Sequence, residues 1–173
     1  AAVSASGALL FDPNLGQSQF WWYDRSGKPL SPVGEPAPYF TFRLSPDGRR
    51  LAAQRGQNLW VIDVERGVSN PFVSTRSGFA AWSPDGRKVA FRAGAPFNLF
   101  VKDSNGSGME QRLTEAATNQ YTSDWSRDGR TIAYHDTDPK TFDDLWLLAM
   151  TPEGKPDGKP RPYLRTAATE MWP

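Results

Sequence analysis

One sequence pattern occurs three times in this chain. In each copy, Leu or Trp leads into a Ser-x-Asp-Gly turn, a basic residue and a short apolar run follow, and an Asn/Asp-Leu-aromatic segment comes next. The copies begin at Leu44, Trp82 and Trp125. A period of about 40 residues that contains turns and short strands is typical of an array of small, similar sheets and not of one continuous fold.

The residues of each copy predict a short antiparallel sheet. In Ser-Pro-Asp-Gly, Pro fixes φ, Asp bonds the local backbone and Gly accepts a positive φ, so the segment predicts a hairpin turn. The apolar run that follows predicts a second strand. A buried third strand is predicted at 58–63, 98–103 and 144–149. A second turn and a polar fourth strand, such as 110–114, complete the copy, as expected of an outer edge.

A degenerate copy precedes these three. Ser6-Gly7 stands where the later copies have Asp-Gly, and 9–11 and 19–24 are expected as its second and third strands. At the other end, 169–173 has the register of the strand that leads into the next turn. We therefore expect one domain of repeated sheets, 1–173, whose sheets end at a boundary between units. The expected units are 1–38, 39–77, 78–119 and 120–168, with 169–173 as the opening strand of a further unit.

The repeat resembles the WD40-like (PD40) family of β-propeller repeats, the type found in the TolB propeller and in propellers of prolyl-oligopeptidase-like proteins. Segments 20–28, 33–36 and 138–141 are similar to bacterial multidomain proteins that join such a propeller to a serine/threonine kinase or a winged-helix regulator. The resemblance implies an all-β fold, a β-propeller-type array of about four four-stranded antiparallel blades from a ring of about six to eight. It implies a sensor or interaction module and no kinase activity in these residues.

Composition bears on partners and compartment. A net charge of +1 provides no electrostatic surface for nucleic acid or an anionic membrane. No apolar run approaches the roughly eighteen residues of a membrane span, so we expect no membrane insertion. The absence of Cys excludes disulfides and thiol chemistry and leaves the compartment open. We favour the periplasm or another extracytoplasmic location.

The sequence contains few residues suited to catalysis. A nucleophile elbow needs Gly-x-Ser-x-Gly, and the nearest string, 16–20, lacks the last Gly. His135 is the only histidine, so a His-based metal cluster is excluded and a Ser-His-Asp triad would depend on that one residue. Glycine-rich phosphate-binding loops are absent as well. We therefore expect no enzymatic activity, no cofactor and no metal.

Two repeated features have both a structural and a functional interpretation. The turn Asp can bond its own backbone or contribute to a ring of carboxylates around a cation, and we favour the turn role for Asp47, Asp85 and Asp128. The recurring Trp can pack between units or form a stacking platform, and we favour core packing for Trp82, Trp125 and Trp172.

The segment from His135 to Asp143 is the best candidate for a binding site. We expect it to be a long loop between the second and third strands of the last unit, on the face opposite the Ser-x-Asp-Gly turns. Loops on a rigid scaffold commonly carry function, and this one contains His135, Asp136 and Asp138. Asp136 and Asp138 can ligate Ca²⁺, but the segment lacks the spacing and Gly of a dedicated calcium loop. A solvated, variable loop is the alternative that we favour.

Two arginines extend this candidate site. Arg55 and Arg92 follow the second strands of two successive units, and they can converge near a central channel and receive an anionic group. An ordinary solvated or channel-lining role is the alternative that we favour. The candidate binding residues are therefore Arg55, Arg92, His135, Asp136 and Asp138.

These observations favour a non-catalytic binding module whose partner is a protein or a small ligand at the loop face. Two alternatives stay open: an access-gating propeller of a prolyl-oligopeptidase-like hydrolase, and a TolB-like periplasmic protein-binding propeller. Sheet faces without a neighbour rarely stay exposed in a soluble protein. We therefore expect either self-association through open blade faces or closure that pairs 2–4 with 163–165.

Overall fold

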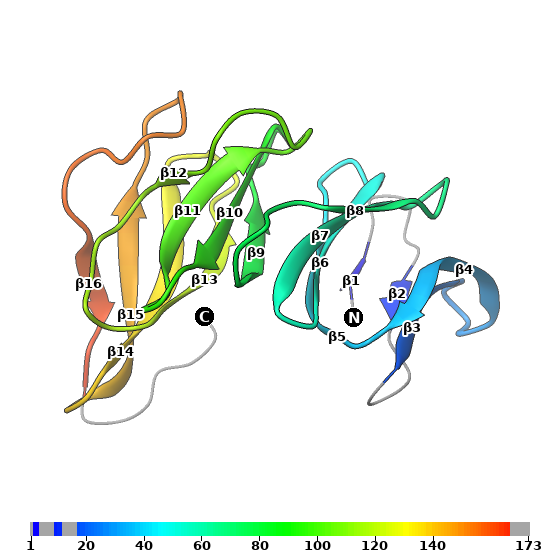
Figure 1. Ribbon diagram of the computed structural model, residues 1–173, viewed down its shortest axis with the longest axis horizontal. Coiled ribbons are helices and arrows are strands. Elements are labelled where there is room, and N and C mark those ends of the chain that lie inside the picture. The colour runs from blue at the N-terminus through cyan, green and yellow to red at the C-terminus, as the bar shows by residue number, and fades with distance from the viewer. Residues whose placement is uncertain (1, 4–8, 12–16, 167–173) are drawn as a thin grey trace. The chain divides into compact units, whose positions relative to one another are not determined.

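The computed structural model describes residues 2–3, 9–11 and 17–166 of the 173-residue chain. Within these ranges the chain forms strands and turns and no helix, so a helix able to span a membrane is also absent there. The described strands form four antiparallel sheets of four strands each (Figure 1). The chain divides into two compact units, 1–78 and 79–173, and each is described by itself. The prediction of an all-β fold is confirmed.

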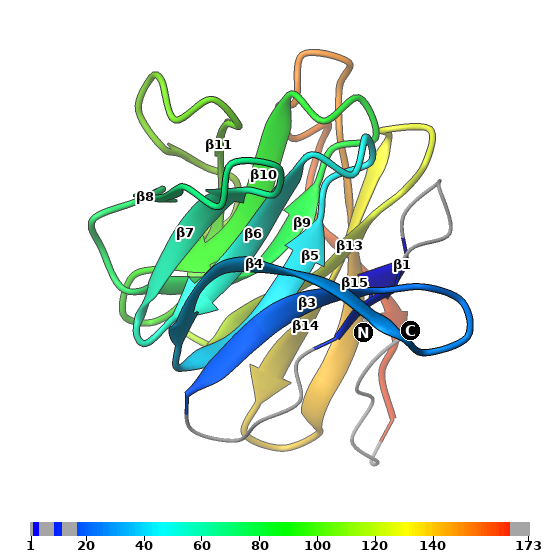
Figure 2. The ribbon, with the colours of Figure 1, turned by 90° about the vertical axis from the view of Figure 1, so that its right-hand side faces the viewer.

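The first unit contains two sheets, whose strands neighbour one another in chain order. Its strands are β1 (Ala2–Val3), β2 (Leu9–Phe11), β3 (Ser18–Tyr23), β4 (Pro29–Ala37), β5 (Tyr39–Leu44), β6 (Arg50–Arg55), β7 (Asn58–Asp63) and β8 (Ser69–Pro71). The twist of the longer strands is seen in Figure 2. The core contains fully buried Phe20, Leu51 and Ile62. The Phe20 ring packs 4.4 Å from the ring of Tyr39 and 4.9 Å from that of Phe42, centroid to centroid.

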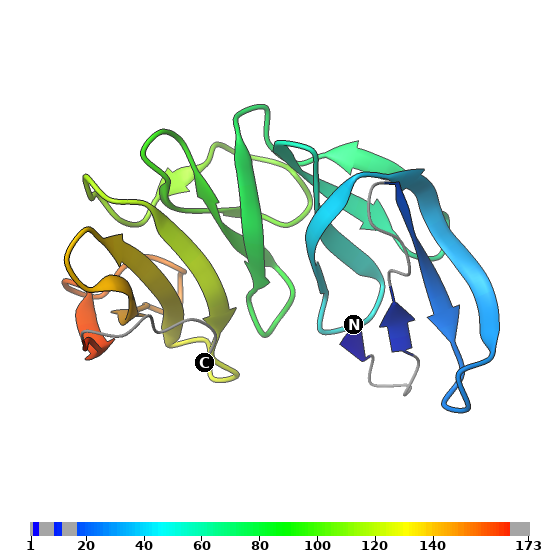
Figure 3. The ribbon, with the colours of Figure 1, turned by 90° about the horizontal axis from the view of Figure 1, so that it is seen from below.

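The second unit follows the same plan. Its strands are β9 (Ser77–Trp82), whose first two residues belong to the first unit, β10 (Lys88–Ala93), β11 (Asn98–Asp103), β12 (Gln111–Arg112), β13 (Gln120–Trp125), β14 (Thr131–Asp138), β15 (Phe142–Ala149) and β16 (Arg161–Leu164). Figure 3 shows these sheets from below. One buried cluster joins them, with Ala90 and Leu99 from one sheet and Ile132, Tyr134 and Leu148 from the other. The expected core role of Trp125 is observed, since it belongs to this cluster and is 6 % exposed.

The repeated turns are held by their own side chains. In each of the three, the Ser hydroxyl donates to the Asp carboxylate at 2.6 Å, and the carboxylate also accepts a backbone N–H two residues further on. The Ser hydroxyl oxygen also accepts a hydrogen bond, at 2.9 Å, from the backbone N–H of the residue that follows the basic residue of the turn. The structure therefore uses Asp47, Asp85 and Asp128 in the turns, as we favoured.

The outer strands of the second unit, β12 and β16, are short and exposed. Both residues of β12 and all four of β16 are exposed, whereas β10 and β11 are largely buried. An outer strand that is short and polar limits edge-to-edge pairing. The edge strand β4 of the first unit differs, since it is nine residues long and buries Val33 and Ala37 in the core. Ser6-Gly7 and 169–173 lie outside the described residues, and the boundaries expected from the repeats stay a prediction.

The expected loop from His135 to Asp143 is wrong as a description of the backbone. β14 continues to Asp138 and β15 begins at Phe142, so that only 139–141 connect the strands. The hairpin is stabilised by polar side chains: the Thr137 hydroxyl donates to Asp143 at 2.6 Å, and the Thr141 hydroxyl donates to Asp144 at 2.7 Å. These hydrogen bonds stabilise the pairing of β14 and β15 although the residues near their connection are polar.

Candidate functional site

Arg92 lies at the centre of a group of aromatic side chains in the second unit. We call Phe79, Arg92, Phe97, Tyr121 and His135 the Arg92 cluster. Its members come from β9, β10, the residue before β11, β13 and β14, so both sheets of the unit contribute. Because β10 runs from the Ser-x-Asp-Gly turn toward Arg92, the cluster lies at the opposite end of that strand from the turn. This is the end at which the β10–β11 hairpin turns.

Three rings surround the Arg92 guanidinium at close range. The Cζ atom lies 4.3 Å from the ring centroid of Phe79, 4.1 Å from that of Phe97 and 4.4 Å from that of Tyr121. An arginine over one aromatic face gains about 0.5–1 kcal/mol when exposed and about 2 kcal/mol when desolvated. Arg92 is half-buried, and three rings restrict its side chain far more than one would. The guanidinium is therefore held in place by packing.

Phe79 adopts an unusual backbone conformation to take part. Its φ is +50°, in the left-handed region that side chains other than Gly rarely adopt. A bulky residue in this region is strained by about 1–2 kcal/mol. Strain of this kind persists where the surrounding structure imposes it, and it is commonly found at ligand-binding and active sites. Here the surrounding contacts include Arg92 and the Tyr121 ring, whose centroid is 5.2 Å away.

His135 packs against the cluster from β14. It is the direct cross-strand partner of Tyr121, and the two rings stack with centroids 4.8 Å apart and planes 7° from parallel. The imidazole is 5 % exposed. Burial lowers the pKa of His135 below its usual 6.5, and the nearby positive charge of Arg92 lowers it further, while Asp143 and Asp136 oppose the shift. Arg92 and His135 are thus brought together, as the prediction of a shared site requires.

The arrangement around His135 does not favour nucleophilic catalysis. The Ser123 hydroxyl lies 3.4 Å from His135 Nδ1, beyond the roughly 2.6–3.2 Å of an activated pair. Ser123 is 4 % exposed, so a substrate would have little access to it. Among the described residues, His, Asp and Glu form no group of three or more that could hold a metal.

Asp136 and Asp138 lie on the other face of β14 from His135, because side chains alternate along a strand. Asp136 accepts a hydrogen bond from the Gln120 amide at 2.7 Å. Asp138 caps its own turn through the N–H of Lys140 at 2.7 Å and pairs with Arg165 at 2.7 Å. The structure therefore places these two carboxylates on the face of β14 away from His135, where they bind Gln120, Lys140 and Arg165.

Arg55 belongs to the first unit and stands at the end of β6, next to a two-residue connection to β7. Its guanidinium lies 5.0 Å from the ring centroid of Trp60. The cross-strand partner of Arg55 is Asn58. Whether Arg55 and Arg92 converge stays a prediction.

Sequence reasoning missed the three rings of the cluster. A usable signal existed, since an aromatic residue recurs near the start of each first strand at Tyr39, Phe79 and Tyr121. Two of the copies also have an Arg at the end of the second strand. The pattern could have suggested an aromatic neighbour for Arg92, but not the number of rings around it.

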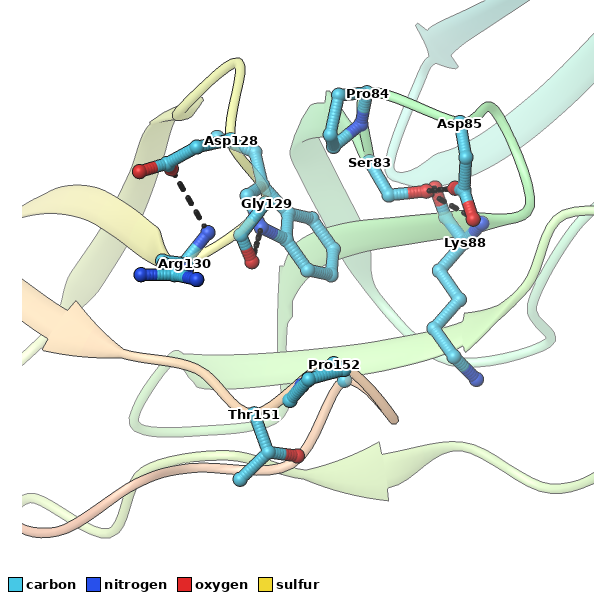
Figure 4. Close-up of a pocket in the computed structure, with 11 residues that line it drawn as sticks. Ser83, Pro84, Asp85, Lys88, Asp128, Gly129, Arg130, Thr151 and Pro152 are labelled. Atoms are coloured by element: carbon cyan, nitrogen blue, oxygen red, sulfur yellow. Dashed lines mark hydrogen bonds between the residues drawn. The ribbon is translucent and has the colours of Figure 1, made fainter.

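A cavity of about 370 Å³ lies at the turn end of the second unit. Figure 4 shows residues of two Ser-x-Asp-Gly turns and of the turn after β15 around it. The lining residues are Ser83, Pro84, Asp85, Lys88, Trp125, Asp128, Gly129, Arg130, Thr151, Pro152 and Gly154. This volume falls within the roughly 300–1,000 Å³ of small-molecule sites.

The charged groups of this cavity already serve the fold. The Ser83 hydroxyl holds the pKa of Asp85 below its usual value, and the Lys88 ammonium lies 2.8 Å from the Asp103 carboxylate. The Lys88 stem packs so closely on Gly154 that a Cβ there would come within 2.8 Å of Lys88 Cδ. Acidic and basic groups balance, so this lining selects no particular ligand charge.

Comparison with solved structures places the fold among β-propellers of the TolB type. A putative TolB from Agrobacterium tumefaciens superposes with a TM-score of 0.71 at 19 % identity, over 96 % of this chain and 66 % of that one. TolB from Acinetobacter baumannii gives 0.66 at 16 % identity, over 86 % of this chain and 39 % of that one. A prolyl endopeptidase gives 0.70 at 16 % identity, over 96 % of this chain and 29 % of that one. Identities this low show the fold alone.

Comparison of sequences adds one curated relative. The uncharacterized peptidase YuxL of Bacillus subtilis (strain 168) is 32 % identical over 105 residues, covering 52 % of this chain and 16 % of that protein. The chain therefore spans about one sixth of that relative's length. No protein-family profile matches the chain.

Proposed function

We propose that this chain is a non-catalytic binding module, a β-propeller portion that recognises a protein or a small ligand in a bacterial multidomain protein of the sensor type. The observation that carries the proposal is the Arg92 cluster. A charged side chain fixed among three rings is prepared for recognition, because little conformational entropy is left to lose on binding. The strained backbone of Phe79 in the same cluster supports this interpretation.

A non-catalytic role is supported by the chemistry of the described residues. The buried Ser123 and its long contact to His135 are poorly suited to nucleophilic attack. The sequence contains no Cys and one His, which leaves few groups for covalent or metal-assisted chemistry.

A gating propeller of a prolyl-oligopeptidase-like hydrolase is the second candidate. It is favoured by the 32 % identity to a protein named as a peptidase and by the structural likeness to a prolyl endopeptidase. A Gly-x-Ser-x-Gly motif elsewhere in the same gene would favour this candidate. A kinase or winged-helix domain encoded there would favour the sensor.

A TolB-like periplasmic protein-binding propeller is the third candidate function, and it is supported by the likeness to two TolB structures.

Site-directed photocrosslinking tests the binding proposal. A photoreactive residue at Ala95, which is exposed in the β10–β11 hairpin beside the cluster, is compared with one at Met109, which is 86 % exposed and lies between β11 and β12. In lysate from the source bacterium, we expect a discrete crosslinked species from position 95 that is absent from position 109 and is lost with Arg92→Met. Equal labelling from both positions, or a species that survives Arg92→Met, would contradict a binding site at the cluster.

A further inference from the structure

We infer that the cavity at the turn end of the second unit is a binding site for a neutral, polyhydroxylated ligand of the sugar type. Its volume of about 370 Å³ is that of a small-molecule site, and two Ser-x-Asp-Gly turns and the turn after β15 surround it (Figure 4). Lys88, at the start of β10, belongs to the lining, whereas Arg92 lies near the other end of that strand. The inference is therefore independent of the binding proposed for the Arg92 cluster.

One part of the lining is apolar. It consists of the Trp125 indole and the rings of Pro84 and Pro152. Trp125 is buried whereas both prolines are exposed, so the indole lies deeper in the cavity than they do. The indole N–H donates to the Gly129 carbonyl at 3.0 Å, so the indole offers a ligand carbon surface and no hydrogen bond. Such a surface suits the C–H face of a sugar ring, because burying apolar area on both partners is favourable.

Arg130 and Asp128 provide hydrogen-bonding groups at the rim, since both line the cavity and are exposed. Within the described part of the chain, the Arg130 guanidinium makes no hydrogen bond or ion pair, so its N–H donors are available. The Asp128 carboxylate binds the Ser126 hydroxyl and the Arg130 backbone N–H through Oδ1, which leaves Oδ2 to accept a further bond. Neighbouring hydroxyl groups match this combination, because each hydroxyl both accepts and donates.

The charges of the lining favour a ligand without net charge. An anion would be repelled by Asp85 and Asp128. A cation would be repelled by Lys88 and Arg130. Lys88 is also paired with Asp103 at 2.8 Å, and a charged ligand would have to compete with that partner. A neutral ligand avoids both repulsions, and its hydroxyl groups can bind charged side chains without displacing the partners that these already have.

NMR on the intact, isotope-labelled chain tests the inference, because the lining contains an indole N–H that reports on the cavity. Trp125→Phe identifies its peak among those of the seven tryptophans. We would titrate the chain with the methyl glycosides of glucose, galactose, mannose and N-acetylglucosamine. Methoxytetrahydropyran is the matched ligand without hydroxyl groups, and the methyl glycosides of glucuronic acid and glucosamine carry a negative and a positive charge. The linear trisaccharide of the glycoside that binds best separates a free sugar from a glycan chain.

We expect a saturable shift of the Trp125 peak with at least one neutral glycoside, at a dissociation constant of about 0.1–10 mM, and none with methoxytetrahydropyran. The charged glycosides should bind no more tightly than the neutral one. Arg130→Met removes donors at the rim and should weaken binding by about tenfold or more. The matched control is Arg127→Met, an exposed arginine of the same turn that is not part of the lining, which should bind as the wild type does.

Four results would overturn the inference: no saturable shift with any neutral glycoside, an equal response to methoxytetrahydropyran, tighter binding of a charged glycoside, or unchanged affinity in Arg130→Met. If Arg130→Met fails to fold, the comparison of ligands on the wild type still decides. Arg92→Met should leave glycoside binding unchanged, so the two sites can fail separately. A crosslinked species at position 95 together with no response to glycosides would reject the sugar site and keep the binding function of the cluster.

Discussion

Phe79 provides a direct test of whether the cluster stores backbone strain. We would compare Phe79→Ala with Phe79→Gly, since both remove the ring and its contacts with Arg92 and Tyr121. The two variants then differ mainly in how well the residue tolerates a φ of +50°. Ala in the left-handed region costs about 1–2 kcal/mol, whereas Gly adopts it freely. Against this, Gly loses about 0.5–1 kcal/mol more conformational entropy on folding.

The balance predicts that Phe79→Gly is more stable than Phe79→Ala by about 0.5–1 kcal/mol. For a chain of this length, that corresponds to a melting temperature higher by about 1–4 °C. The assay is urea denaturation, in which the midpoint should rise from Ala to Gly without a change in slope. Both variants should be less stable than the wild type, because a half-buried ring and its cation–π contact are lost.

Two further positions serve as controls. Phe142 has a φ of +69° in the β14–β15 hairpin and is 59 % exposed, so the same pair of substitutions there should also favour Gly. Ala149 lies at the exposed end of β15 with an ordinary φ, and Ala149→Gly should instead destabilise by about 0.5–1 kcal/mol. If Phe79→Ala proves as stable as Phe79→Gly, the left-handed conformation and the strain argument are both refuted.

Three more outcomes are expected. Burial lowers the pKa of folded His135, so as the pH is lowered the unfolded chain binds the proton first. The free energy of unfolding should therefore be at its full value above about pH 6.5 and should fall as the pH decreases from there to the folded-state pKa. His135→Gln should remove this loss in urea melts. Ser83→Ala removes hydrogen bonds to Asp85 and Lys88 at a buried turn and should lower the free energy of unfolding by about 1–3 kcal/mol. The control, Ser107→Ala at an exposed turn, should lower it by less than about 0.5 kcal/mol. Equal losses would contradict the structural role of the Ser83 turn. Self-association should appear in light scattering as a species of about twice the 19.2 kDa chain mass that dissociates on dilution, and a mass that stays monomeric at every concentration would reject it.

The regular part of the fold could be predicted from local sequence. The third strands of two copies, β7 (Asn58–Asp63) and β11 (Asn98–Asp103), match the predicted ranges residue for residue. Their apolar character and the turns that flank them are local signals, since Pro, Asp and Gly each impose a backbone conformation within a few residues. The turn hydrogen bonds of Ser83 and Asp85 follow from the same short segment.

The hairpin at 135–143 was not predictable in this way. Its Asp, Thr, Pro and Lys residues are typical of a loop, because each of the short polar ones can bond its own backbone. The structure instead pairs Thr137 with Asp143 across the strands and anchors Asp138 through Arg165, a residue of the strand region that follows much later in the chain. A partner such as Arg165, which lies 27 residues from Asp138, cannot be identified from a local pattern.

The candidate site was predicted in part for the same reason. Arg92 and His135 were identified as charged or titratable groups near strand ends, which is a local property. Their grouping depends on which ring of the neighbouring sheet reaches them, and Tyr121 does so through the β13–β14 register. Asp136 and Asp138 were assigned to the same site because a loop was expected, and the alternation of a strand places them on the other face.

The central claim is that Arg92, the aromatic rings and His135 form one packed cluster. The pKa of His135, measured by NMR titration of its ring protons in the wild type and in Arg92→Met, tests this most directly. The account predicts a pKa below the usual 6.5 in the wild type and a higher value in the variant, because a neighbouring positive charge has been removed. A His135 that titrates at its ordinary value in both proteins would contradict the cluster.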